Sequence, residues 1–154
     1  MLFVLFQVGK DRYAICANDV VEVLPLVELK EVPSAPLPVA GLFIYRGNPT
    51  PVIDLTQCLS NQPARRCLST RVLVTNYVLE SGETRTLGLM AERANETMAR
   101  SERDFTDGGV NNDEAPYLGP VVRDARGLIQ WVRVEKLLPP EVQAVLFRDA
   151  PGAA

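Results

Sequence analysis

Few side chains in this sequence could carry out chemistry, and the most versatile catalytic one is missing. The chain contains no histidine, which excludes Ser-His-Asp and Cys-His catalysis, imidazole proton transfer and mixed Cys/His zinc sites. The three cysteines, Cys16, Cys58 and Cys67, show no CxxC spacing, and their odd number favours reduced thiols over a disulfide or redox pair. Cys58 and Cys67 also have no base that would generate a thiolate. These residue types argue against an enzyme.

The acidic residues and glycines follow no catalytic or ligand-binding spacing. The polar segment 104–114 offers the oxygen ligands that calcium prefers, but it does not match the D-x-[DN]-x-[DN]-G pattern. No carboxylate pair has a spacing that specifies acid–base work, and neither GxxxxGK[ST] nor GxGxxG occurs. We therefore expect no metal, no cofactor and a solvated polar loop over residues 107–116.

The segment 41–55, GLFIYRGNPTPVIDL, carries the strongest functional signal. It places Arg46 and Gly47 at a turn between two apolar runs, and a lone cation at a tight turn suits recognition better than catalysis. The segment therefore predicts a docking site on a binding module. The alternative is an ordinary turn arginine that pairs with a surface carboxylate, an interaction worth less than about 1 kcal/mol. Trp131 lies within another apolar run and is expected to pack in the core.

Length and composition are typical of a globular domain. The 154 residues are 47% hydrophobic and 23% charged, with a net charge of −3, so the chain should bury roughly 70% of its unfolded surface. The negative charge provides no basic field for nucleic acid or an anionic membrane. Residues 1–6 are apolar but lack the basic region of a signal peptide, and no apolar run approaches the ~20 residues of a membrane span. We expect a cytoplasmic protein.

Branched and aromatic runs separated by turn residues predict a mostly β fold. Three hairpins are expected, pairing residues 2–8 with 13–17, 71–78 with 85–90, and 117–122 with 127–134. Two further strands are expected over residues 39–45 and 51–55, on either side of the arginine turn. Short strands at regular spacing indicate barrels or a sandwich.

Helices should be few. Asn18 is a good N-cap and predicts a short helix over residues 19–24, although three valines there also favour a strand. Pro140 at a first helical position predicts a final amphipathic helix to about residue 147. Residues 91–102 fit a helix or a bulged strand. Residues 57–66 are expected to link two halves of the chain, and residues 149–154 to fray.

Taken together, these blocks resemble the CheW family of chemotaxis coupling proteins over about residues 2–147. The most specific match is PVAGLFIYRG at residues 38–47 followed by PVIDL at residues 51–55. Residues 3–6, Gly9 and residues 13–15 resemble the family's opening hairpin, and residues 18–23 resemble its short helix. Looser matches lie at residues 87–89, 117–119, 128–132 and 134–138.

The resemblance implies two SH3-like five-stranded β-barrel lobes that share a hydrophobic seam, with a short N-terminal helix and a C-terminal helix. It implies one domain over residues 1–148, with lobes at roughly 1–66 and 67–138 and the last helix at about 140–147. The implied function is a non-enzymatic adaptor that couples the cytoplasmic helical tips of methyl-accepting chemoreceptors to the regulatory domain of a CheA-type histidine kinase. These partners would recruit it to membrane receptor arrays.

The resemblance also implies roles for individual residues. Val20, Glu22, Gly41, Arg46 and Gly47 fall on the receptor-binding side. Arg46 would be the central polar contact, and Gly47 would permit a turn that a β-carbon could obstruct. The kinase face is implied on the first lobe, around residues 46–55 and the adjoining strand edges.

Two departures from the family pattern bear on the choice of partner. In the second lobe's part of the groove, where relatives place small apolar residues, this chain has Ala94 and Thr97 within a charged segment. Pro49 and Pro51 stiffen the arginine turn. Both departures hint at a specialised chemosensory pathway, such as surface sensing or pili. Two alternatives stay open: a competitor that binds only receptor or kinase, and, less favoured, an enzyme that uses acidic residues or a thiol.

Overall fold

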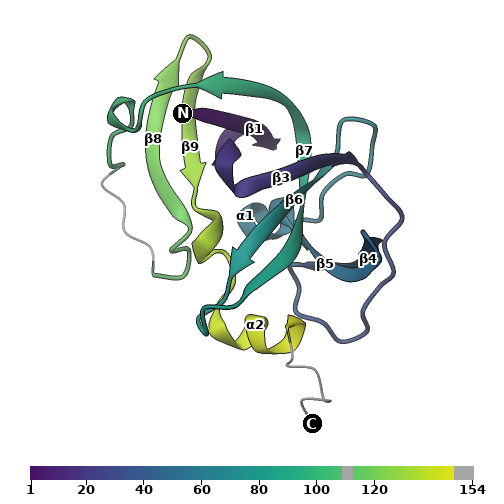
Figure 1. The fold of residues 1–154 in the computed structure, drawn as a ribbon. Coiled ribbons are helices and arrows are strands. Elements are labelled where there is room, and N and C mark those ends of the chain that lie inside the picture. Colours follow the sequence, from purple (N-terminus) through teal and green to yellow (C-terminus); the bar gives the residue numbers. More distant parts are fainter. Residues whose placement is uncertain (109–112, 148–154) are drawn as a thin grey trace.

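The computed structural model describes residues 1–108 and 113–147 of the chain (Figure 1). Its strands are β1 (Leu2–Val8), β2 (Asp11–Cys16), β3 (Val20–Pro25), β4 (Val39–Tyr45), β5 (Asn48–Asp54), β6 (Arg71–Val78), β7 (Thr84–Ala99), β8 (Leu118–Asp124) and β9 (Gly127–Val132). Its helices are α1 (Leu55–Ser60) and α2 (Pro140–Leu146), with 3-10 turns η1 (Ala17–Asp19), η2 (Glu102–Asp104) and η3 (Val134–Lys136). None of the helices in the described ranges is long and apolar enough to cross a membrane.

The strands form two five-stranded SH3-like lobes that share the long strand β7. The first barrel has the order β3-β6-β7-β5-β4, and the second has the order β7-β1-β2-β9-β8. Residues 84–91 of β7 pair with β6, and residues 92–99 lie along β1. Figure 1 shows β7 running from the β6 hairpin to the sheet that holds β1. At the crossing, Arg93 has a left-handed φ of 50°, which marks a bulge where the strand changes sheet.

One isolated bridge joins the edges of each barrel. In the first barrel, Lys30 and Leu42 exchange two backbone hydrogen bonds of 2.8 Å, which ties the segment after β3 to β4. In the second, Thr106 and Val121 exchange two bonds of the same length, which ties the segment after η2 to β8. Each barrel is therefore closed by a single residue pair instead of a full ladder, and its closing edge keeps backbone and side chains accessible.

The two barrels are interleaved along the sequence, so the predicted division near residue 66 is not the division between them. The N-terminal hairpin β1–β2 belongs to the second barrel, whereas β6 and the first half of β7 belong to the first. The reason is that β7 pairs with β1 from the start of the chain and with β5 and β6 from its middle, which no local pattern in the sequence reveals.

The predicted hairpins are confirmed as β1–β2, β6–β7 and β8–β9, and the predicted final helix is confirmed as α2. The predicted helix over residues 19–24 is wrong, because residues 20–25 form β3 and pair with β6. Only the 3-10 turn η1 precedes that strand. The ambiguous residues 91–102 continue β7 as far as Ala99. The loop expected over residues 107–116 lies partly, and the tail at 149–154 wholly, outside the described residues.

Residues 57–66, expected to be a linker, begin with the short helix α1. Asp54 caps this helix because its carboxylate accepts from the Gln57 backbone N–H at 3.1 Å. The other carboxylate oxygen accepts from the Ala64 N–H at 2.9 Å. One buried aspartate thus fixes both the helix and the loop that returns from it.

Three apolar clusters hold the barrels together. One fills the second barrel, where the rings of Phe3, Phe105 and Trp131 contact one another. A second fills the first barrel around Val52 and Met90. The third and largest draws on strands of both barrels and on α2, and forms the hydrophobic seam between them. Trp131 is 5% exposed, which confirms its predicted core position.

Candidate functional site

A two-residue turn joins β4 to β5. Tyr45 and Asn48 are the last paired residues of the hairpin, and Arg46 and Gly47 between them have φ values of 49° and 82°. Type I′ turns require this left-handed combination, which asparagine and glycine adopt more readily than arginine. A β-carbon at Gly47 would meet nothing within 4 Å. The glycine is therefore needed for its backbone conformation and not for the space around it.

Arg46 projects from this turn and is held by two neighbours. Its Nη2 lies 3.3 Å from Oε1 of Glu22, on β3, and its guanidinium carbon lies 5.1 Å from the centre of the Tyr45 ring. The Tyr45 hydroxyl donates a 2.7 Å hydrogen bond to the same Glu22 oxygen. Strands β3 and β4, which share no ladder, therefore contribute to one polar cluster of three side chains.

The ion pair confirms the alternative expected from the sequence, in which Arg46 is a turn arginine that pairs with a surface carboxylate. The side chains of Arg46 and Glu22 are 71% and 40% exposed, so the pair stabilises the fold by less than about 1 kcal/mol. In the described residues, Glu22 is the one acceptor that bonds to this guanidinium. A guanidinium has five N–H donors in a planar fork, so most of them face solvent. Arg46 can bind a carbonyl or carboxylate from outside without losing its internal partner.

Glycine is required at position 41 for a structural reason that the sequence does not disclose. A β-carbon there would lie 2.6 Å from the Lys30 carbonyl oxygen and 3.0 Å from the Leu29 β-carbon. The glycine lets the segment after β3 approach β4 closely enough to form the bridge that closes the first barrel. Gly41 therefore positions the hairpin and presents no side chain to a partner.

Val20 and Glu22 lie on opposite faces of β3. A bulge between them pairs Val20 with Thr75 and Glu22 with Val74, which are successive residues on β6. Val20 consequently packs against the seam between the barrels, whereas Glu22 points toward Tyr45. Of the five predicted receptor-side residues, Glu22, Arg46 and Gly47 lie together at the turn, whereas Val20 and Gly41 stand apart from this cluster.

The two second-lobe candidates differ in accessibility. Ala94 is 4% exposed and packs in the seam between the barrels, so its side chain offers no surface to a partner. Thr97 is exposed and pairs with Val4 of β1. Arg93, Asn95 and Glu96 are exposed beside it, which makes this stretch of β7 polar.

An apolar hollow of about 620 Å³ lies beside the arginine turn, at the closing edge of the first barrel. It is lined by Leu29, Leu42, Phe43, Ile44 and Pro49, with Glu28 and Lys30 at its polar end. Ile44 is 65% exposed, a large fraction for an isoleucine on a barrel strand. Exposed apolar surface of this kind, next to polar groups, is typical of protein–protein contacts.

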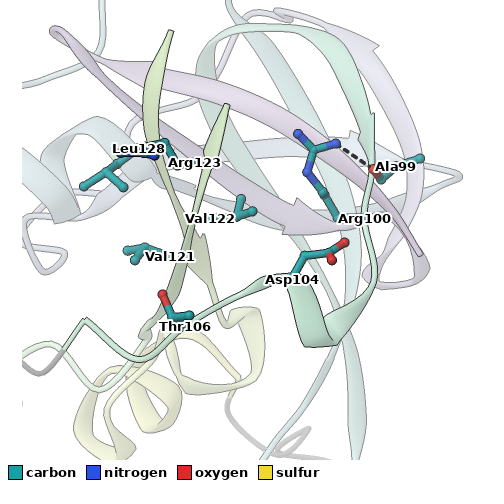
Figure 2. A pocket seen from close by; sticks show the side chains of 8 residues that line it. All are labelled: Ala99, Arg100, Asp104, Thr106, Val121, Val122, Arg123 and Leu128. Atoms are coloured by element: carbon teal, nitrogen blue, oxygen red, sulfur yellow. Dashed lines mark hydrogen bonds between the residues drawn. The ribbon is translucent and has the colours of Figure 1, made fainter. Parts of the chain in front are cut away.

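A second hollow, of about 580 Å³, lies at the closing edge of the second barrel. Figure 2 shows Arg100 and Asp104 on one side of it and Val121, Val122 and Leu128 on β8 and β9. The Arg100 guanidinium donates to the Ala99 carbonyl at 3.0 Å, and Asp104 accepts from the Ser101 N–H at 2.8 Å. Arg100 and Asp104, two of the three charged residues that line this hollow, thus have local structural partners.

The thiols differ strongly in environment. All three are free, with Cys16 buried, Cys58 half-buried and Cys67 exposed. Burial raises the pKa of Cys58 to about 12, whereas hydrogen bonds from Ser69 and Thr70 lower the pKa of Cys67 to about 7. Within residues 1–108 and 113–147, no group of three His, Cys, Asp or Glu side chains is placed to hold a metal ion.

Sequence reasoning missed Tyr45, which is the residue that connects the cluster. Its position one residue before the turn arginine is visible in the sequence, but its hydrogen bond to Glu22 depends on how β3 lies against β4. The site as a whole is a shallow surface that combines the exposed Arg46 guanidinium with an adjoining apolar hollow. Such an arrangement is typical of protein–protein contacts.

Comparison with known proteins agrees with this description. The family model for the CheW-like domain matches residues 2–141. The chemotaxis protein CheW of Treponema pallidum is 26% identical over 136 residues, which cover 87% of this chain and 79% of that protein. The crystal structure of the scaffolding protein TtCheW of Thermoanaerobacter tengcongensis superposes with a TM-score of 0.78 at 20% identity, covering 92% of this chain and 89% of that one.

Proposed function

The chain belongs to the CheW-like domain family, and on that premise we propose that it is a non-enzymatic adaptor of a chemosensory pathway. It joins the cytoplasmic helical tip of a methyl-accepting chemoreceptor to the regulatory domain of a CheA-type histidine kinase. Its cellular place is the cytoplasmic face of receptor arrays, where these partners hold it.

The observation that carries the proposal is the conformation of Arg46. A left-handed arginine costs roughly 1–2 kcal/mol of backbone strain, and the exposed pair with Glu22 returns less than about 1 kcal/mol. The fold therefore gains little from an arginine at this position. A strained, exposed residue that contributes little to stability is best explained by a role in binding.

We place receptor binding at the cluster of Glu22, Arg46 and Gly47, which Gly41 positions. The receptor tip is a helix, and Arg46 offers donors to a carbonyl or carboxylate on it. Val20 contributes indirectly, because the bulge between Val20 and Glu22 on β3 directs the Glu22 side chain toward the turn. Ala94 supports the second lobe's part of this surface from within, and Thr97 provides its exposed side chain.

We place kinase binding on the apolar hollow that adjoins the turn. Leu42, Phe43 and Ile44 of β4 supply its apolar surface, and Pro49 of β5 borders it. Exposed apolar groups at the centre of a contact with a polar rim are typical of docking between folded domains. Both proposed partners then contact the same hairpin, β4–β5.

The polar stretch around Thr97 supports a specialised pathway, such as surface sensing. Arg93, Asn95 and Glu96 are exposed there, so a receptor tip that binds this stretch needs polar groups opposite it. Binding a panel of receptor tips from the same organism to the purified protein tests this specialisation. Preference for the tip of a flagellar chemotaxis receptor would contradict it.

The coupling role is tested by titrating the protein with a receptor-tip fragment and with the kinase regulatory domain, first singly and then together. A coupler binds each partner and forms the three-component complex. Arg46→Ala should weaken receptor binding at least about 30-fold and leave kinase binding within about threefold. Arg85→Ala is the matched control, because Arg85 also forms a surface ion pair, to Glu83 at 2.8 Å, but on another hairpin.

Other outcomes of this titration are equally informative. If one partner displaces the other, the protein is a competitor. If the folded wild-type protein binds neither partner, the adaptor role fails.

A further inference from the structure

We propose that Tyr45 is a positioning residue that holds Arg46 in its binding orientation before the partner arrives. This inference deepens the proposed function and rests on it for the identity of the partner. The positioning itself does not depend on the proposed function, because it is a property of the free protein. Nothing in the family resemblance assigns a role to this tyrosine.

Tyr45 contacts both other members of the polar cluster. Its hydroxyl donates to Glu22 Oε1 at 2.7 Å, and Arg46 Nη2 donates to that same oxygen at 3.3 Å. Its ring lies beneath the Arg46 guanidinium, 5.1 Å from ring centre to guanidinium carbon. The tyrosine therefore holds the carboxylate through its polar end and the cation through its aromatic face.

Tyr45 can do this because it is itself fixed. Its ring packs against the apolar cluster of the first barrel and lies 6.1 Å from the ring of Phe43. The hydrogen bond to Glu22 also raises the pKa of Tyr45 above its usual value of 10.0, as expected for a hydroxyl that donates to a carboxylate. A well-packed ring with a protonated hydroxyl is a suitable support that can order a long flexible side chain.

Arg46 needs such a support because it lies on an exposed turn. An arginine side chain that is 71% exposed samples many rotamers, and a partner that binds it must pay for their loss. The single 3.3 Å contact with Glu22 is long for a charge-assisted bond. The ring contact and the fixed carboxylate together restrict the guanidinium before binding.

The first test measures Arg46 motion in the free protein. We would compare the Nε–Hε order parameter of Arg46 by nitrogen-15 relaxation in the wild type, Tyr45→Phe and Tyr45→Leu. The wild type should give a value above about 0.6, Tyr45→Leu a value clearly below it, and Tyr45→Phe a value between the two. The control is Tyr117→Phe, which removes a hydroxyl bonded to the Cys58 carbonyl at 3.1 Å and should leave Arg46 unchanged.

The second test measures binding of the receptor-tip fragment. Tyr45→Leu should weaken binding about tenfold and Tyr45→Phe about threefold, since the partner must then order the arginine itself. In an Arg46→Ala background, Tyr45→Phe should have a clearly smaller effect than in the wild type, because only Glu22 is left to position.

The two tests fail in different ways. An Arg46 order parameter that is the same in Tyr45→Leu and the wild type overturns the positioning role, whatever binds. An unchanged affinity of Tyr45→Leu for the tip also overturns it. If the wild type binds no receptor tip, the proposed function fails, and the relaxation result still decides whether Tyr45 orders Arg46.

Discussion

Replacing Arg46 by asparagine should separate the stability of the β4–β5 turn from its use in binding. Asparagine adopts the left-handed conformation several-fold more readily than most residues, and Asn-Gly is the favoured pair for this turn. Relief of strain should add about 1 kcal/mol to the free energy of unfolding. Loss of the exposed ion pair and of the ring contact should each subtract about 0.5–1 kcal/mol. The net change should therefore lie within about 1 kcal/mol of zero.

Binding should respond very differently to the same substitution. Removing an arginine at the centre of an interface costs about 2 kcal/mol or more, which corresponds to receptor-tip binding weakened at least about 30-fold. Stability can be measured by urea unfolding followed through the fluorescence of Trp131, the single tryptophan, and affinity by calorimetric titration. Arg46→Ala is a useful companion, because it loses the same contacts without relieving the strain and should be about 1 kcal/mol less stable than Arg46→Asn.

Two results would refute this reasoning. A loss of more than about 2 kcal/mol in Arg46→Asn would show that the arginine is a structural residue whose contacts outweigh its strain. Native stability combined with unchanged receptor binding would show that the exposed guanidinium is not used for recognition.

Three further predictions concern other parts of the molecule. Gly47→Val should cost about 2 kcal/mol in urea unfolding, because valine resists a φ of 82° even with open space around it; stability equal to wild type would show that the turn rearranges. Hydrogen bonding from Arg12 holds the pKa of Asp124 well below its usual 3.8, so this carboxylate stabilises the fold fully above about pH 4 and progressively less below it. Asp124→Asn should lower stability at pH 7 by about 2 kcal/mol and flatten the acid limb of the stability profile, and an unflattened limb would contradict the pairing. Cys67 should react with iodoacetamide with a midpoint near pH 7, while Cys58, with a pKa of about 12, should stay unmodified at neutral pH; equal labelling of both by mass spectrometry would contradict these environments.

Local chemistry was sufficient to predict most strands. Hairpins β1–β2, β6–β7 and β8–β9 have glycine in or directly after the turn and branched or aromatic residues on both sides, so the sequence pattern and the fold agree. The helix α1 was missed although its signal is present. Asp54 is followed three residues later by Gln57, a spacing typical of a helix start, but the branched residues directly before Asp54 indicate only the end of a strand.

The remaining features depend on contacts between distant residues. Asn18 suits an N-cap, but pairing with β6 determines that residues 20–25 form a strand. The same pairing creates the bulge that turns Val20 and Glu22 to opposite faces, which a strict alternation along the strand does not predict. Assignment of β1 and β2 to the second barrel likewise depends on β7, which the sequence presents as one strand followed by an ambiguous segment.

Within the candidate site, the sequence predicted the turn and its arginine but not the partners of that arginine. Gly47 and the flanking apolar runs are local signals, whereas Glu22 and Tyr45 meet only because the bulged β3 lies against β4. Gly41 was assigned to the receptor surface, and the structure gives it a different task, the close approach to Lys30. A residue's place in a family motif therefore indicates that it matters without indicating how.

The proposed adaptor needs no internal movement to couple its partners. The polar cluster at the tip of β4–β5 and the apolar hollow along its closing edge share one hairpin, which β5 anchors to the strand common to both barrels. Leu42 illustrates the link, because its backbone closes the first barrel and its side chain lines the hollow. A displacement of the receptor helix that moves Arg46 would thus move the kinase surface with it. In the proposed adaptor, signal transfer would then depend on the stiffness of this single hairpin.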